Sequence, residues 1–235
     1  EKSDMDRAIT WNNLACYYRR TGKLRTAVTF LERALAIEEH TENADSAQTH
    51  LNLCATLSQL QRHADAVYHA QSALIRIYEI LSPLMLSGEL SSLPGSADSE
   101  RYQQVTVLCI AYHNLAVEHE YLKNFESAVC TYAEGLRWAT RFLSDGHQLV
   151  GILRDCIQAV KGKLPQNSRA LKRVTDLLQG GSRQGGGAER SGGGGRGSGS
   201  EADASLSERQ LGGLLTPRGG AQSHRGDTSP ASSTH

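Results

Sequence analysis

The stretch that decides the fold runs from Trp11 to Tyr18, reads WNNLACYY, and is followed by Gly22 and Ala27. Residues three and four positions apart share one face of an α-helix, so this stretch places an apolar stripe along a helix. Gly22 can adopt a positive φ at no steric cost, which predicts a reversal of the chain there. Ala27 then begins a second apolar stripe that continues through Leu31. The segment therefore predicts a hairpin of two antiparallel helices.

The same spacing of residue types recurs twice further along the chain. Residues 50–54 read HLNLC and residues 112–116 read YHNLA. In each copy a Leu lies three residues after a ring-bearing residue, a small residue follows it, and a second small residue comes twelve positions later. The paired small residues are Ala15 with Ala27, Cys54 with Ala66, and Ala116 with Ala128. Small side chains at both places let two helix axes approach to the short end of the usual ~8–10 Å range. The pattern predicts stacked hairpins that stabilise one another.

This combination of residues resembles the tetratricopeptide repeat, in which an aromatic residue, a Leu and small residues hold these positions. The copies depart from that pattern at His50, which replaces the leading aromatic residue, and at His119 and Lys123, which replace a Tyr and the turn Gly. The Asn that precedes the Leu in each copy, together with the segment 34–39, is also similar to the longer repeats of kinesin light chains. The resemblance implies an all-α, right-handed superhelix of three stacked hairpin repeats and a capping helix.

The organisation of the chain follows from the spacing of the copies and from shifts in composition. We expect a helical domain over residues 1–179, with repeats at about 8–41, 47–82 and 109–142 and capping helices at 146–162 and 168–179. The surplus between the second and third copies contains Pro83 and Pro94 and predicts an insertion loop at 83–99. That loop is either a tolerated surface loop or a lid over a groove. Residues 180–235 are rich in Gly, Ser and Arg, with few apolar residues, which predicts a disordered tail.

Composition argues against several classes of partner and location. The chain has 25 Lys and Arg against 25 Asp and Glu, so its formal net charge of zero favours neither nucleic acid nor an acidic membrane surface. No stretch approaches the ~20 apolar residues of a membrane helix. The five cysteines are odd in number and form no C-x-x-C pair, which favours small buried side chains in a reducing cytoplasmic compartment. The resemblance to kinesin light chains leaves a ciliary or cytoskeletal location open.

Motifs of catalysis and metal binding are incomplete in this sequence. His119 and Glu120 begin like the zinc motif H-E-x-x-H, but Lys123 stands where the second His would be required. The Gly-rich tail lacks the Gly-Lys-Ser/Thr ending of a phosphate-binding loop, and no Ser stands in a G-x-S-x-G context. The sequence therefore predicts a protein that is not an enzyme and needs neither a cofactor nor a metal.

Binding of a protein partner is the function that the resemblance implies. In tetratricopeptide-repeat proteins the first helices of successive repeats line a concave groove that holds extended or helical peptide segments. Carried onto this sequence, the groove candidates are Ile9, Asn12, Cys16, Arg19, Arg20, Gln48, Leu51, Ala55, Ser58, Gln59, Ile110, His113, Val117, Glu120 and Tyr121. The alternative for each is a side chain that simply faces water. A neutral, partly apolar floor favours an amphipathic or Leu-containing peptide of a partner protein.

One subset of the family clamps the terminal carboxylate of its ligand with Lys, Asn and Arg side chains. The corresponding positions here are Asn12, Cys16, Ala55, His113 and Val117, and only the first has the expected polarity. Without an ammonium or guanidinium partner, a carboxylate is poorly held at the groove floor. The sequence therefore predicts that the protein is not a receptor for acidic chaperone tails, although Arg19 and Arg20 at one end would favour a flanking acidic residue.

Two other functions remain open at the level of sequence. Arg183, Arg190 and Arg196 lie among glycines and are similar to Arg-Gly segments that bind RNA through weak electrostatic and stacking contacts. Nearby acidic residues cancel most of that charge, and no aromatic residue follows Phe142, so nucleic-acid binding is disfavoured. The second alternative is a regulatory or cargo-adaptor fragment of a larger assembly. Two dipeptides of the tail, Thr216-Pro217 and Ser229-Pro230, are of the kind that proline-directed kinases modify, although such dipeptides are common by chance.

Overall fold

The computed structural model describes residues 2–41, 46–88, 100–143, 146–180 and Thr216. Within these residues all regular secondary structure is helical, and the described part of the chain contains no strand. The helices are α1 (Lys2–Arg20), α2 (Leu24–Glu38), α3 (Ala47–Gln59), α4 (His63–Leu86), α5 (Glu100–Tyr121), α6 (Phe125–Phe142), α7 (Gln148–Lys161) and α8 (Arg169–Gly180). The prediction of an all-α fold is confirmed.

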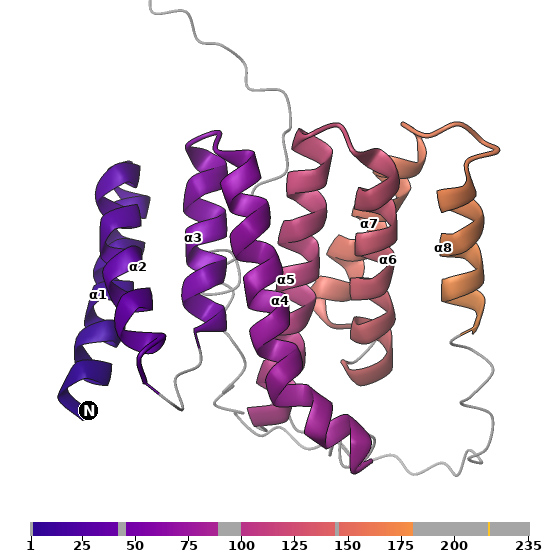
Figure 1. Cartoon of the computed structure of the whole chain (residues 1–235). Helices are drawn as coiled ribbons and strands as arrows, with labels where there is room; N and C mark the ends of the chain where they lie inside the picture. Colours follow the sequence, from indigo (N-terminus) through magenta and orange to yellow (C-terminus); the bar gives the residue numbers. More distant parts are fainter. Residues whose placement is uncertain (1, 42–45, 89–99, 144–145, 181–215, 217–235) are drawn as a thin grey trace, which may run out of the picture.

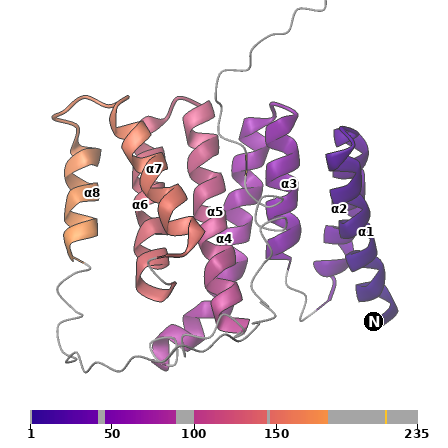
Figure 2. The same ribbon diagram turned by 180° about the vertical axis from the view of Figure 1, so that it is seen from behind.

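The helices stack as hairpins in the order of the chain. Helix α1 packs against α2, α3 against α4, and α5 against α6, and each hairpin also packs against the next through α2 with α3 and α4 with α5. Helices α7 and α8 both pack against α6. Figures 1 and 2 show the stack running from α1 at one end to α8 at the other. This arrangement of stacked helix pairs agrees with a solenoid of the tetratricopeptide type.

The three hairpin turns have the same backbone geometry although their sequences differ. Gly22, Gln61 and Lys123 all have positive φ, at 77°, 61° and 62° respectively. In each turn the N–H of the next residue donates to the carbonyl five positions earlier: Lys23 to Tyr18 at 2.9 Å, Arg62 to Leu57 at 2.9 Å and Asn124 to His119 at 2.8 Å. These bonds satisfy carbonyl groups that the end of a helix leaves without partners. The turn is therefore a property of the repeat rather than of glycine.

Small side chains bring the helices of each hairpin close together. Ala15, Ala27, Cys54, Ala66, Ala116 and Ala128, which the sequence places at the crossing points, are at most 1% exposed. Gly135 of α6 also lies close to α5, since an added Cβ would lie 2.9 Å from Tyr112 Cβ. Gly135 therefore allows α5 and α6 to pack at a distance that a larger residue would increase.

The core consists of two hydrophobic clusters. The smaller one joins the first two hairpins around Leu31 and Leu53, and the larger one extends from α3 to α8 around Tyr132 and Leu153. Leu74 of α4 packs against both clusters, so one helix connects them. Stability that is shared between neighbouring hairpins in this way is typical of repeat proteins.

Two segments of special interest in the sequence fall outside the described residues. Helix α4 continues past Pro83 to Leu86, and α5 begins at Glu100, so the expected loop at 83–99 lies largely in residues 89–99, which the structure does not describe. The expected tail begins at residue 180, which is the last residue of α8. Beyond it, only Thr216 is described.

Candidate functional site

Asn12, one of the predicted groove residues, connects the first two repeats. Its Nδ2 donates to Thr49 Oγ1 at 3.0 Å, and its Oδ1 accepts from Asn52 Nδ2 at 2.8 Å. Thr49 Oγ1 in turn donates to Glu38 Oε1 at 2.9 Å. The network joins α1, α2 and α3 through buried or half-buried groups, where hydrogen bonds are strong and unpaired groups are costly. Asn12 therefore contributes to the register between repeats as well as to the predicted surface.

Asn114 of α5 holds a residue from far along the chain. This Asn is the counterpart of Asn52 in the third repeat and is fully buried. Its Oδ1 accepts the backbone N–H of Thr216 at 2.8 Å, across 102 positions of sequence. Thr216 is 2% exposed, and its Oγ1 lies 3.8 Å from Sγ of Cys54 on α3. The surface between α3 and α5 thus contacts both the backbone and the side chain of Thr216.

A buried carboxylate, that of Glu118, lies close to this surface. Glu118 Oε2 is 2.7 Å from His63 Nδ1, and the His63 ring stacks on Tyr121 with 4.2 Å between ring centroids. Burial raises the pKa of Glu118, while hydrogen bonds from Ser58 and His63 act in the opposite direction. Burial, with the charge of Glu118 adding to it, also raises the pKa of the Cys54 thiol. Because only a thiolate is a good nucleophile, Cys54 is unsuited to catalysis at neutral pH.

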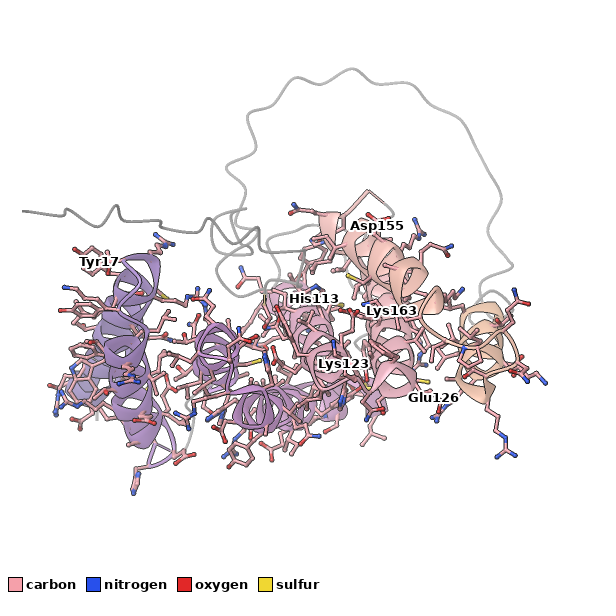
Figure 3. The ribbon with its side chains drawn as sticks, turned by 90° about the horizontal axis from the view of Figure 1, so that it is seen from above. Tyr17, His113, Lys123, Glu126, Asp155 and Lys163 are labelled. Carbon is pink, nitrogen blue, oxygen red and sulfur yellow. The ribbon has the colours of Figure 1, made fainter. Side chains whose placement is uncertain are left out.

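Glu120, another predicted groove residue, connects α5 to the C-terminal end of the stack. Its Oε1 accepts from the Tyr132 hydroxyl at 2.9 Å, and its Oε2 accepts from Lys163 Nζ at 2.8 Å. Figure 3 shows His113 and Lys163 near the middle of the stack, far from Tyr17 at the α1 end. Glu120 is 7% exposed, so the ion pair with Lys163 is partly desolvated and is a structural contact between α5 and the segment after α7.

The predicted groove residues divide into two groups by exposure. Ile9, Arg20, Gln48 and Gln59 are exposed, Asn12, Cys16, Arg19 and Tyr121 are half-buried, and Leu51, Ala55, Ser58, Ile110, His113, Val117 and Glu120 are buried. Leu51, Ile110 and Val117 belong to one hydrophobic cluster, so the structure brings the apolar candidates of the second and third repeats together. The candidates from α1 are less enclosed, and Ile9 is 56% exposed.

Three residues of this surface were not among the predicted candidates: Cys54, Asn114 and Thr216. The recurrence of Asn before Leu in each copy is a signal for Asn114, since a buried Asn needs hydrogen-bond partners. For Thr216 the only local signal is the apolar pair Leu214 and Leu215 within a polar tail.

The described helices give no sign of a metal site or a membrane span. Among the described residues, no group of three or more His, Cys, Asp and Glu side chains is arranged to hold a metal ion. None of the helices in that part of the chain combines the length and the apolar character needed to cross a bilayer.

Comparison with known families adds an independent observation. A family model described as "Tetratricopeptide repeat" matches residues 8–48, which comprise most of α1, all of α2 and the start of α3. A search of curated proteins found no match to the chain. The repeated turns, the buried small residues and the stacked hairpins extend the same architecture beyond the matched segment. The family match supports a tetratricopeptide repeat at residues 8–48, and the stacked helix pairs of the fold are consistent with a solenoid of that type.

Proposed function

We propose that this chain is a non-catalytic protein–protein interaction module, a scaffold that binds a peptide segment of a partner along α1, α3 and α5. The observation that supports this most directly is the hydrogen bond from the Thr216 N–H to Asn114 Oδ1 at 2.8 Å. A side-chain amide carries both a donor and an acceptor, so it can hold the backbone of an extended segment whatever the side chains are. This surface accepts a peptide backbone in the folded chain.

The chemistry around Thr216 favours binding over catalysis. The polar groups of Glu118 and His63 contact each other, and the pKa of the Cys54 thiol is raised by burial. A general base or nucleophile needs a pKa matched to its task, which these surroundings do not provide for the thiol. The apolar groove candidates Leu51, Ile110 and Val117, which belong to one cluster, favour a partner segment that supplies aliphatic side chains.

A cytoplasmic location is the proposal that the cysteines support. All five, Cys16, Cys54, Cys109, Cys130 and Cys156, are free thiols, and three of them are buried. Free thiols persist in reducing compartments, where disulfides are rare. We therefore expect an intracellular partner protein.

The test is to identify a partner segment and to measure its affinity for matched variants of the full chain. Cross-linking in cell lysate followed by mass spectrometry would give the segment, which is then synthesised and titrated by isothermal calorimetry. We expect Asn114→Ala to weaken binding at least tenfold, because the amide no longer accepts a backbone N–H. Tyr68→Ala, at an α4 residue that is 62% exposed, is the control and should bind as the native chain does.

Circular dichroism must show that both variants remain as helical as the native chain. If Asn114→Ala and Tyr68→Ala bind the segment with the affinity of the native chain, the surface between α3 and α5 is not the binding site, and the proposal is wrong.

A further inference from the structure

We propose that the resident ligand of this surface is the chain's own segment around Thr216, so that a partner peptide must displace it. This inference rests on the proposed function, because it concerns the same surface. Residues 211–218 read LGGLLTPR, so three aliphatic residues, Leu211, Leu214 and Leu215, precede Thr216 closely in the sequence. The anchor of the segment is Thr216, whose position is described.

The contacts of Thr216 are those of a bound peptide residue. Its N–H is donated to the buried Asn114 on α5, and its hydroxyl lies 3.8 Å from the buried Cys54 on α3. Thr216 is therefore held by two different repeats and is 2% exposed. The large majority of buried polar groups in proteins have hydrogen-bond partners, and here α3 and α5 provide those of Thr216.

Occupation in the same chain gives this segment an advantage over any free peptide. Tethering converts binding into an intramolecular step, with an effective concentration on the order of millimolar for short flexible connections. A partner segment with the same intrinsic affinity at micromolar concentration would not displace it. The tethered segment therefore excludes weakly binding ligands. A partner binds if its segment has a higher affinity for the surface, or once Thr216 has been released.

The surroundings of Thr216 also predict how it can be released. The charge of Glu118 acts on the Cys54 thiol that Thr216 contacts, so the region already contains one buried carboxylate. A second negative charge at residue 216 would be both desolvated and repelled there. Replacement by Asp should therefore expel the segment, and replacement by Pro should do so by removing the N–H that Asn114 accepts. Replacement by Ser keeps the N–H and the hydroxyl and should leave the segment bound.

Amide hydrogen exchange of Thr216 in the full chain tests the contact directly. We expect the Thr216 amide to exchange at least tenfold more slowly than its intrinsic rate, and this protection to disappear in Asn114→Ala. The matched control is Asn13→Ala, at the exposed counterpart in the first repeat, which should leave the protection unchanged. Exchange of Thr216 at the intrinsic rate in the native chain would overturn the proposal.

Competition provides the second readout. A labelled synthetic peptide of residues 208–222 is titrated against the native full chain and against Thr216→Pro, Thr216→Asp and Thr216→Ser. We expect the Pro and Asp variants to bind it at least tenfold more tightly than the native chain, because their own segment no longer occupies the surface. The Ser variant should resemble the native chain. Equal affinity for all four chains, or no binding to any, contradicts self-occupation.

The two proposals fail in distinguishable ways. If the partner segment binds the native chain and Thr216→Pro equally well, but depends on Asn114, the surface is a peptide site without a resident ligand. If the 208–222 peptide behaves as expected, but partner binding does not depend on Asn114, the self-contact is real and the partner site lies elsewhere.

Discussion

At the scale of single residues, the ring-bearing position that leads each repeat shows how one replacement changes local chemistry. Trp11 in the first repeat is half-exposed and has the guanidinium of Arg7 5.2 Å from its ring centroid. Tyr112 in the third repeat shares a hydrogen bond of 2.6 Å with the Tyr78 hydroxyl. His50 in the second repeat is 3% exposed, and its Nδ1 is 2.9 Å from Nδ1 of another histidine, His69. The second repeat alone among them therefore has an imidazole as its leading side chain.

The pair of histidines predicts a stability that depends on pH. Burial lowers the pKa of His50 to about 4, with the charges of His69 and Arg76 acting in the same direction. In the unfolded chain a His has a pKa of about 6.5, so the unfolded state binds more protons below that pH. Neutral His50 therefore makes its full contribution to the free energy of unfolding above about pH 6.5, and this contribution is lost as the pH falls from about 6.5 to about 4. Urea denaturation at pH 7 and pH 5 should show a loss on the order of 2 kcal/mol.

The variant His50→Phe keeps a ring at the leading position and removes its titration. We expect the difference in unfolding free energy between pH 7 and pH 5 to be smaller in this variant than in the native chain. An unchanged difference would assign the acid sensitivity to other groups.

At the scale of elements, the three hairpin turns share one backbone conformation although a different residue type stands in each. Gly22, Gln61 and Lys123 hold the same left-handed conformation, which costs a residue with a Cβ roughly 1–2 kcal/mol. The hydrogen bonds of the turn and the packing of the two helices offset that cost. An element can therefore retain a conformation that its own sequence disfavours when both of its neighbours are well packed.

Lys123→Gly is expected to stabilise the protein by about 0.5–1 kcal/mol, because glycine adopts the turn conformation without strain but loses more chain entropy on folding. The reciprocal change, Gly22→Ala, should destabilise by a similar amount. No atom lies within 4 Å of a Cβ added at Gly22, so that effect would come from the backbone alone. Urea denaturation of both variants at one pH measures the two changes, and an effect of the same sign in both would contradict the interpretation.

At the scale of the whole molecule, the stack is more strongly buried at its centre than at its α1 end. Ile9, Leu14 and Tyr17 of α1 are 56%, 38% and 60% exposed, whereas Leu108 and Ile110 of α5 are fully buried. Helix α1 packs on α2 and only slightly on α3, while α5 packs on α4 and α6 and also contacts α3 and α7. A stack of repeats opens first where the fewest neighbours hold it.

Hydrogen exchange followed by mass spectrometry should therefore show the least protection in α1 and the greatest in α5. Leu31→Ala, at a residue of α2 that is 1% exposed, should cost about 2–5 kcal/mol in the N-terminal cluster and accelerate exchange in α1 and α2. Exchange in α5 and α6 should change much less. Uniform acceleration across all the helices would instead indicate one cooperative unit.

The sequence by itself determined the parts of this protein that depend on local spacing. Helical periodicity, the recurring pairs of small residues and the turn positions act over a few residues, and the all-α fold and the resemblance to tetratricopeptide repeats followed from them. These features are local because helix geometry repeats every 3.6 residues. The left-handed turn at Lys123 did not follow from them, because Lys123 departs from the turn Gly of the pattern and only the structure shows its positive φ.

Only the tertiary structure decided which groups the predicted groove residues contact. It showed that Asn12 and Glu120 make contacts between helices and that Asn114 accepts a hydrogen bond from Thr216. The two residues of that last contact are 102 positions apart, and no periodic pattern connects them. Such a contact depends on which side chains the stacked helices bring to one place, and that is a property of the assembled fold rather than of any one helix.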